Sequence, residues 1–358
     1  MQQFKNIQIK LMSTDKGAEP KFIVVIGASA GGLHSLIELM AQMQEEMNIA
    51  VFAVLHTPNI AFSDLVIKRI QKNSVFTCKV AEDNEPIQAK HLYLAEPDKH
   101  LILKRGKIVL GRGPVENRWR PSIDVLFRSA AVAYTGRVIG IILTGMLEDG
   151  VAGMEIIKEC GGTCIVQDPQ EAEYPDMPMA VLRSVKVDYC TSLQRMGIIL
   201  QEKARNGAKE LHAIPPRIAK EAEIAARVAI GIEDVASLSG VKSNYSCPDC
   251  GGGLWEIHEG GITRFRCHTG HMYTSNELLE SKRNELESTF WVALRIFEER
   301  RNLLNKMADE ESGKGWAQSA KNKMQRAGEL RVHIERLKQL LYESTDDPEP
   351  TRLELEGK

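Results

Sequence analysis

The chain has 358 residues, of which 43% are hydrophobic and 26% are charged, and its formal net charge is −2. This composition predicts a soluble globular protein of two or three domains. The balanced charge excludes a general electrostatic attraction to nucleic acid or anionic membranes, and no apolar run is long enough to insert into a membrane. Three of the seven cysteines cluster with histidines, which favours a metal site in a reducing compartment over disulfides. We expect a cytoplasmic protein without a secretory segment.

Residues 1–20 are polar and are expected to form a flexible arm. From residue 21 to about 203, short apolar runs alternate with segments in which apolar residues have helical spacing. Such alternation predicts an α/β domain with a doubly wound, mostly parallel sheet. The predicted strands are 22–26, 51–55, 75–80, 92–95, 101–103, 108–110, 138–143 and 163–167, and the predicted helices are 31–46, 61–72, 121–134, 150–160 and 177–184.

The stretch from Phe22 to Leu33 predicts a strand, a tight turn and a helix. Within it, Gly27, Ser29 and Gly31 match G-x-S-x-G, the pattern of a nucleophile elbow. The glycines let the chain reverse, so that the serine hydroxyl stands at the carboxyl end of the strand. A phosphate-binding loop and a plain structural turn are alternatives, although the stretch has neither a dinucleotide fingerprint nor a Walker loop.

Two further predicted strands are followed by polar side chains. His56 follows the run 50–55, and Asp149 lies a few residues after the run 138–143. Because ligands of doubly wound sheets bind outside the carboxyl ends of the strands, Ser29, His56 and Asp149 can meet there as a catalytic triad. The chain order Ser–His–Asp disfavours the α/β-hydrolase fold, in which the acid precedes the histidine.

Each of these residues also has a structural interpretation. His56 can be a half-buried structural histidine, and Asp149 can cap the helix that begins near Gly150. Glu148 is an alternative catalytic acid. The alternative bases are His34, His91 and His100.

Several motifs follow one another in order over residues 21–195. They are Gly-Ala-Ser-Ala-Gly-Gly (27–32), Leu-His-Thr-Pro (55–58), Tyr-Leu-Ala-Glu-Pro-Asp-Lys-His (93–100), Arg-Pro-Ser-Ile-Asp-Val-Leu-Phe-Arg-Ser-Ala (120–130), Leu-Thr-Gly-Met-Leu-Glu-Asp-Gly (143–150), Gly-Gly (161–162), Gln-Asp-Pro (167–169) and the segment 174–180 with its Met-Pro pair. Together these motifs resemble the chemotaxis protein-glutamate methylesterases of the CheB type.

The resemblance implies that Ser29, His56 and Asp149 form the catalytic triad and that the backbone at Met146 helps to hold the oxyanion. It implies hydrolysis of γ-glutamyl methyl esters on the cytoplasmic helices of a chemoreceptor through an acyl-enzyme, without a catalytic cofactor, and glutamine deamidation as a related activity. The chain departs from the family pattern at three positions: Leu147 stands where glycine is usual, Glu96 replaces a usual proline, and Thr57 follows the histidine where Met or Leu is common.

Partners and regulation follow from the same resemblance. Three arginines near the predicted site either complement an acidic substrate or are merely solvated: Arg118, Arg120 and Arg128. Family members usually begin with a receiver domain, and the twenty residues before the first strand are too few for one. Regulation is therefore expected from a protein partner or from the second half of the chain. The alternative function is a non-enzymatic scaffold that docks on receptor helices and recruits partners through its C-terminal regions.

Residues 204–243 are expected to be a partly helical linker, and residues 244–275 a zinc-ribbon-like module. Cys247 and Cys250 form a Cys-x-x-Cys knuckle, and the returning segment supplies Cys267 and His271. Three thiolates and one imidazole would form a closed structural zinc site. His268 is an alternative fourth ligand and His258 a weaker one, and unmetallated cysteines are the other interpretation. The sequence Arg264-Phe265-Arg266 hints at nucleic acid, but a core aromatic between solvated arginines is favoured, so no nucleic acid is expected.

Residues 276–344 predict two helices with apolar residues three and four positions apart, separated by a polar loop over 309–315. They are interpreted as an antiparallel helical hairpin or as a coiled coil that forms oligomers. Residues 345–358 are acidic and are expected to be a disordered tail.

Overall fold

The computed structural model describes residues 19–56, 63–206, 213–225, 240–259 and 262–345. Contacts divide the chain into two compact units, Met1–Leu278 and Leu279–Lys358. The arm at 1–18, Thr57, the linker segments 207–212 and 226–239, and the tail at 346–358 lie outside the described residues. Within the described residues, no helix is both long and apolar enough to cross a membrane.

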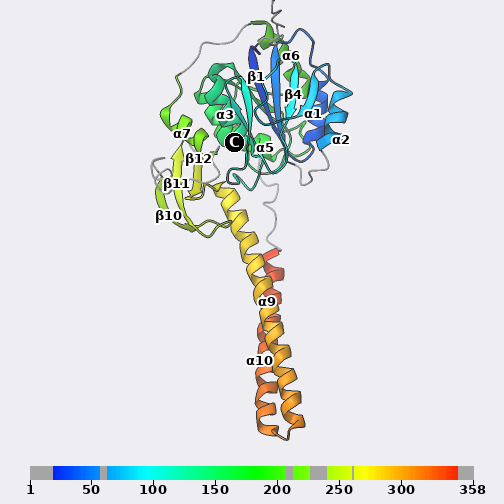
Figure 1. Cartoon of the computed structure of the whole chain (residues 1–358), viewed down its shortest axis with the longest axis vertical. Helices are drawn as coiled ribbons and strands as arrows, with labels where there is room; N and C mark the ends of the chain where they lie inside the picture. Colours follow the sequence, from blue (N-terminus) through cyan, green and yellow to red (C-terminus); the bar gives the residue numbers. More distant parts are fainter. Residues whose placement is uncertain (1–18, 57–62, 207–212, 226–239, 260–261, 346–358) are drawn as a thin grey trace, which may run out of the picture. The chain divides into compact units, whose positions relative to one another are not determined.

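The first unit contains a seven-stranded sheet in the order β3-β4-β2-β1-β7-β8-β9 (Figure 1). Every neighbouring pair of strands is parallel, so the predicted α/β class is confirmed. The order on either side of β1 is that of a doubly wound sheet, with β2 on one side and β7 on the other. The strands are β1 (Phe22–Ala28), β2 (Ile49–Leu55), β3 (Thr77–Val80), β4 (His91–Leu94), β7 (Val138–Ile142), β8 (Thr163–Gln167) and β9 (Tyr189–Thr191).

Helices cover both faces of this sheet. One apolar cluster joins the sheet to α1 (Gly32–Met40), α2 (Ser63–Gln71) and α6 (Leu193–Asn206). A second cluster joins the other face to α3 (Ile123–Tyr134), α4 (Val151–Glu159) and α5 (Asp176–Ser184). Because neither face meets water, β1 and β2 are buried along their whole length and are apolar without alternation.

Some predicted elements differ from the observed ones. The strands predicted at 101–103 and 108–110 form a separate antiparallel hairpin, β5 (His100–Lys104) and β6 (Lys107–Gly111), which packs beside α3. The helix predicted over 31–46 ends at Met40, and a short 3-10 helix (Thr135–Arg137) follows α3. The sequence did not predict β9, because a strand of three residues is too short to show a periodic pattern.

After the helix α7 (Pro216–Ala225), the chain forms a four-stranded antiparallel sheet in the order β10-β11-β12-β13. We call residues 241–274 the β module. Its small core gathers Cys247, Leu254, Phe265, Cys267, Tyr273 and Leu278. The strands are β10 (Val241–Ser246), β11 (Gly253–Glu259), β12 (Ile262–Cys267) and β13 (Met272–Thr274).

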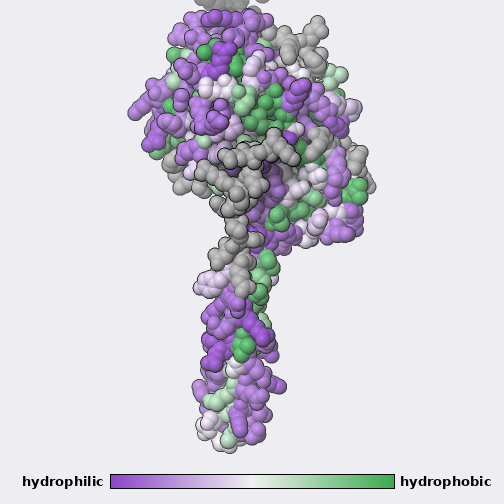
Figure 2. Space-filling view, turned by 180° about the vertical axis from the view of Figure 1, so that it is seen from behind, coloured by the Kyte–Doolittle hydropathy of each residue, from purple (hydrophilic) through white to green (hydrophobic). Residues whose placement is uncertain are grey.

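The second unit is formed by most of α9 (Ser275–Gly313) and by α10 (Ala317–Thr345), which run side by side (Figure 1). The two helices pack through Leu294, Ile334 and Leu341. The helical hairpin is as predicted, but α9 continues to Gly313, so the turn is shorter than the predicted loop. The face of the hairpin seen in Figure 2 is mainly hydrophilic, with hydrophobic side chains between the polar ones.

Candidate active site

The three residues of the predicted triad follow neighbouring strands. Ser29 comes directly after β1 and His56 directly after β2, and the loop after β7 carries Asp149. The backbone N–H of His56 donates to the carbonyl of Ala28 at 3.1 Å, and that of Ser29 donates to the carbonyl of Thr144 at 3.1 Å. The parallel order β2-β1-β7 therefore brings the three residues to one edge of the sheet.

His56 and Asp149 form a buried pair. His56 Nε2 lies 3.0 Å from Asp149 Oδ2, and the two side chains are 1% and 2% exposed. The indole ring of Trp119 stacks on the imidazole with a centroid separation of 4.0 Å. The second ring nitrogen, Nδ1, is buried and has no hydrogen-bond partner among the described residues.

The carboxylate of Asp149 is held from several sides. Asn117 Nδ2 and Ser122 Oγ donate to Oδ1 at 3.0 and 2.9 Å, and the backbone N–H of Ile123 donates to Oδ2 at 2.7 Å. Burial raises the pKa of Asp149, but the hydrogen bonds from the imidazole, from Asn117 and from this N–H lower it below its usual value. An ionised carboxylate can only accept, so the histidine Nε2 carries the proton and Nδ1 keeps its lone pair.

The observed contacts of Asp149 differ from the alternative interpretation. Its carboxylate meets the amino end of α3, whereas Gly150, with φ of +102°, occupies the cap position of α4. Sequence reasoning missed Asn117 and Ser122 as partners of this carboxylate. Ser122 belongs to a motif that the family resemblance includes, but Asn117 lies in a segment without periodicity.

Small residues bring the neighbouring loops close to Ser29. Gly31 has φ of +72° at the cap position of α1, and the N–H of Gly32 donates to the Ser29 carbonyl at 2.9 Å. A Cβ atom on Gly145 would lie 2.9 Å from Ser29 Cβ, closer than side chains pack. The loop after β7 can therefore approach the serine only because residue 145 is glycine. Ser29 itself is partly exposed.

The rest of that loop carries Met146, Leu147 and Glu148. Met146 is 45% exposed, and its predicted role at the oxyanion stays a prediction. Leu147 has φ of +69°, a left-handed conformation that favours glycine, which explains why glycine is usual there. Glu148 accepts hydrogen bonds from Thr274 Oγ1 at 2.9 Å and from Asn276 Nδ2 at 2.5 Å, so it points away from the role of catalytic acid.

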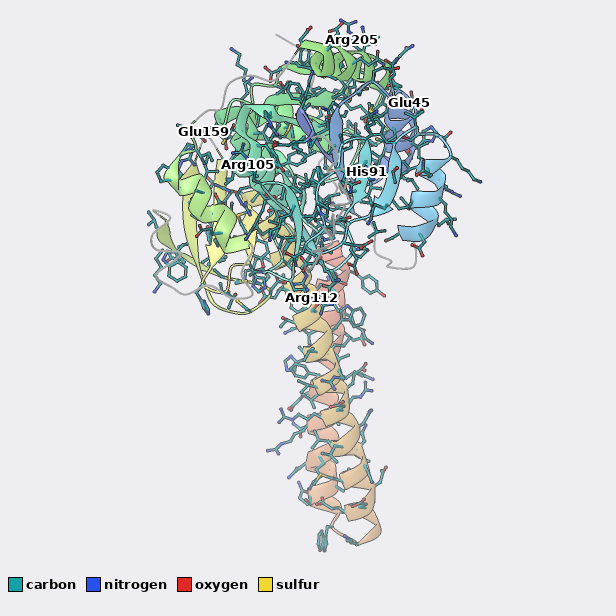
Figure 3. The ribbon with its side chains drawn as sticks, turned by 45° about the horizontal axis from the view of Figure 1, so that its top comes forward. Glu45, His91, Arg105, Arg112, Glu159 and Arg205 are labelled. Atoms are coloured by element: carbon teal, nitrogen blue, oxygen red, sulfur yellow. The ribbon has the colours of Figure 1, made fainter. Side chains whose placement is uncertain are left out.

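The alternative bases lie elsewhere. His34 is exposed on α1. His91 stands at the amino end of β4, the opposite end from the edge with the predicted triad (Figure 3). Its Nδ1 lies 3.0 Å from the carbonyl of Ala89. His100 is fully buried, its Nε2 lies 2.8 Å from the Pro114 carbonyl, and burial lowers its pKa.

Of the three arginines considered for substrate binding, Arg128 is neither exposed nor solvated. Its side chain is fully buried and donates to both carboxylate oxygens of Glu116 at 2.9 Å. Arg120 is bound to Asp98 at 2.6 and 3.0 Å. The side chain of Arg118, 37% exposed, is the one of the three that is most accessible to a substrate.

The favoured interpretation of Arg264 and Arg266 as solvated residues is wrong. Their side chains are 3% and 0% exposed, and both contact Glu221 of α7. Neither guanidinium is available to nucleic acid. The strand β12 turns both side chains away from solvent. The sequence did not predict this burial, because charged residues at alternate positions suggest a solvated face.

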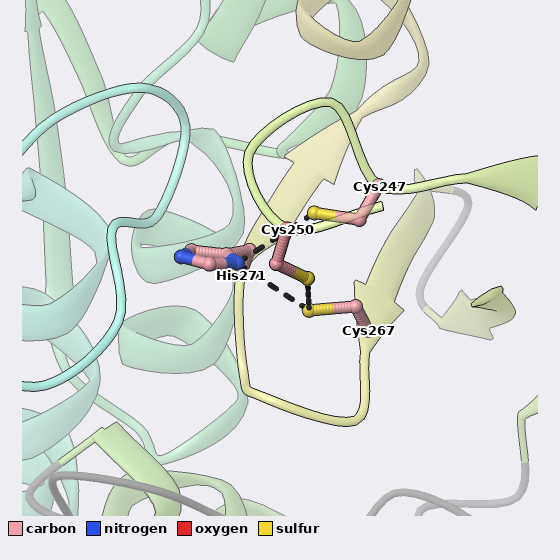
Figure 4. A group of neighbouring side chains, drawn as sticks. All are labelled: Cys247, Cys250, Cys267 and His271. Atoms are coloured by element: carbon pink, nitrogen blue, oxygen red, sulfur yellow. Dashed lines mark hydrogen bonds between the residues drawn. The ribbon is translucent and has the colours of Figure 1, made fainter. Parts of the chain in front are cut away.

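The β module brings together the four predicted metal ligands. The ligand atoms of Cys247, Cys250, Cys267 and His271 all lie within 4.8 Å of one another (Figure 4). The two sulfurs of Cys250 and Cys267 are 3.7 Å apart, and His271 Nδ1 lies 3.5 and 3.6 Å from the sulfurs of Cys267 and Cys247. Tetrahedral zinc would set these separations at about 3.8 and about 3.6 Å. The ring of His268 lies instead against Gly252.

Comparisons with known proteins relate the α/β domain to one family. Residues 24–200 match the family model described as CheB methylesterase. A relative from Leptospira interrogans serovar copenhageni, whose name provisionally assigns protein-glutamate methylesterase/protein-glutamine glutaminase activity, is 35% identical over 189 residues, which are 52% of this chain and 97% of the relative. The relative from Maricaulis maris, named protein-glutamate methylesterase/protein-glutamine glutaminase, is 32% identical, and the match covers 52% of this chain and 47% of that protein.

The chain is also similar to the crystal structure of the CheB methylesterase catalytic domain of Thermotoga maritima. The two have 33% sequence identity and a TM-score of 0.49, and the match covers 51% of this chain and 97% of that domain. Residues 201–358 lie beyond the family model. Because nearly the whole Leptospira relative is matched at 35% identity, and the family model matches residues 24–200, the chain belongs to the CheB methylesterase family.

Proposed function

We propose that this protein is a serine esterase that hydrolyses γ-glutamyl methyl esters on the cytoplasmic helices of chemoreceptor-like proteins. The observation that carries the proposal is the buried His56–Asp149 pair, whose remaining ring nitrogen has no partner among the described residues, beside the turn that carries Ser29. The names of the relatives support the substrate class. Arg118 follows Asn117, is 37% exposed and lies 4.0 Å from the buried Glu277, and its remaining exposed cationic surface suits an acidic helix.

The chemistry follows from the protonation state of the pair. His56 Nδ1 takes the proton from Ser29 Oγ as that oxygen bonds to the ester carbonyl carbon. Backbone N–H groups at Met146 and at the start of α1 hold the oxyanion. The imidazolium, stabilised by Asp149, returns the proton to the methoxy oxygen, and methanol leaves. Water then hydrolyses the acyl-enzyme to free glutamate, and a glutamine side chain reacts in the same way with loss of ammonia.

Ser29→Ala tests this function. Methanol release from a methylated receptor fragment should fall by roughly a thousandfold or more, because the nucleophile of a triad cannot be replaced by its partners. A fluorophosphonate probe should label the wild-type protein at Ser29, as read by peptide mass spectrometry. Ser184→Ala, at an exposed serine at the end of α5, is the matched control. Unchanged methanol release in Ser29→Ala would favour the scaffold function instead.

We infer further that the β module holds one structural zinc ion. The separations among three thiolates and one imidazole suit its tetrahedral coordination, and four protein ligands leave no open position for catalysis. Metal analysis should find about one zinc per chain in the wild type and almost none in Cys247→Ser. Cys190→Ser, at an exposed cysteine outside the cluster, should keep its zinc. Purified wild-type protein without zinc would refute the inference.

A further inference from the structure

The β module contacts the segment that leads into the active site. Glu116 and Met272 form a parallel bridge, the N–H of Asn117 donates to the Met272 carbonyl at 2.8 Å, and the N–H of Met272 lies 3.4 Å from the Val115 carbonyl. These residues all belong to the first compact unit. The strand β13 thus adds one short stretch of pairing to the loop before α3.

Asn117 connects this contact to the catalytic acid. Its side chain is fully buried, and Nδ2 donates to Asp149 Oδ1 at 3.0 Å and to Asp124 Oδ2 at 2.7 Å. One amide therefore lies between two buried carboxylates that would otherwise face each other. The backbone of Asn117 is left-handed, with φ of +51°, a conformation that asparagine tolerates better than most residues.

The other side of the catalytic acid is held by the same part of the chain. Glu148 precedes Asp149, and its two carboxylate oxygens accept from Thr274, the last residue of β13, and from Asn276, in the first turn of α9. Residues 272–276 therefore contact both the segment that carries Asn117 and the loop that carries Glu148 and Asp149. A shift of the β module would move the amide donor and the loop of the acid together.

Buried charges fix where the β module docks. Arg266 of β12 contacts Glu116 at 3.3 Å, and Glu116 also binds Arg128 of α3. Glu221 of α7 binds Arg264 at 2.7 Å. Because a buried charge without its partner is strongly destabilising, this network favours one position of the β module over any sliding of it.

We propose that Asn117 is a positioning residue for the catalytic carboxylate and that the β module and the first turn of α9 hold Asn117 and Glu148 in place, so that ester hydrolysis depends on these segments. This inference rests on the proposed function. It assigns the β module a role in the catalytic geometry.

Asn117→Gly is the sharpest variant, because glycine accepts the left-handed backbone and removes only the amide. With a methylated receptor fragment, kcat should fall roughly tenfold to a hundredfold while KM stays within about twofold, since the substrate-binding surface is unchanged and the acid is displaced. The rate of fluorophosphonate labelling at Ser29 should fall in parallel. Asn84→Gly is the matched control: Asn84 is also left-handed, with φ of +62°, but it is exposed and lies on another loop.

The double variant Thr274→Val/Asn276→Ala tests the role of the β module. It should lower kcat several-fold at unchanged zinc content, and Asn302→Ala, at an exposed asparagine farther along α9, should not. Wild-type kcat in both Asn117→Gly and the double variant would overturn the inference. The proposed function fails separately, when Ser29→Ala keeps its activity, so the two failures are distinguishable.

Discussion

At the scale of single residues, the loop between β7 and α4 contains a strained backbone conformation, which the glycine usual in the family would not have. Leu147 adopts φ of +69°, where a Cβ atom is strained and glycine is not. The neighbouring Glu148 is tied to residues 274 and 276, and Asp149 is tied to the histidine and to α3. These contacts on the following residues keep the leucine in a conformation that it would not adopt alone.

Leu147→Gly is therefore expected to relieve strain without moving the acid. The free energy of unfolding should rise by about 1 kcal/mol, a gain limited by the greater entropy of glycine in the unfolded chain. Urea denaturation measures this change, and methanol release should stay near the wild-type rate. Leu147→Val, with a β-branched side chain in the same conformation, should be less stable than the wild type. A valine variant as stable as the glycine variant would contradict the account.

At the scale of elements, a buried ionic network joins α3, α7 and β12. Three arginines and two glutamates take part, and all five side chains are at most 5% exposed: Arg128, Arg264, Arg266, Glu116 and Glu221. Burial raises the pKa of Glu221, but the three arginines outweigh it and lower the pKa to about 2. The network specifies how the β module docks more than it stabilises the fold, because desolvation offsets much of the attraction.

The lowered pKa of Glu221 predicts a specific dependence of stability on pH. Its ionised form stabilises the folded state above the ordinary carboxyl pKa near 4.5, and this contribution is lost as pH falls towards about 2. Glu221→Gln should lower the free energy of unfolding at pH 6 by on the order of 3 kcal/mol, and by less at pH 3.

Urea denaturation at pH 6 and at pH 3 measures the loss in the free energy of unfolding at each pH. Glu45→Gln is the control, since Glu45 is exposed at the rim of the α/β domain (Figure 3), and it should change stability little at either pH. An equal loss in Glu221→Gln at pH 6 and at pH 3 would show that the carboxylate charge does not contribute.

At the scale of the whole molecule, the chain separates into an enzyme unit and a helical hairpin. The packing of the hairpin rests on a few apolar residues between its two helices, including Leu294, Ile334 and Leu341. The candidate triad and the β module all lie before residue 279. Substitutions that destabilise the hairpin should therefore leave the esterase activity unchanged.

Ile334→Asp places a carboxylate at a fully buried position of α10. The hairpin should lose roughly 3 kcal/mol or more of stability, because the variant loses apolar burial and gains an unpaired buried charge. Circular dichroism should show a lower melting temperature for part of the helical signal, with methanol release unchanged. Val332→Asp, at a residue 51% exposed on the same helix, should melt like the wild type. Loss of esterase activity in Ile334→Asp would show that the two units are coupled.

Sequence patterns were sufficient for the elements whose periodicity is local. The apolar runs of β1, β2 and β7, the helices α1 to α5 and the long helices α9 and α10 all carry their spacing in consecutive residues. The position of Ser29, His56 and Asp149 after predicted strands also indicated that they can share one edge, because parallel strands place their carboxyl ends together.

Tertiary structure decided which charges are buried and which loops support the site. Arginine side chains are usually solvated. Burial of Arg128, Arg264 and Arg266 is possible because they pair with carboxylates across the fold, Glu116 and Glu221. Asn117 acquires its place between two carboxylates through pairing with residue 272, far along the chain. The sequence by itself determined the elements and the candidate triad. Contacts between distant segments decided how the acid is held, because burial and hydrogen bonding depend on neighbours that local spacing cannot show.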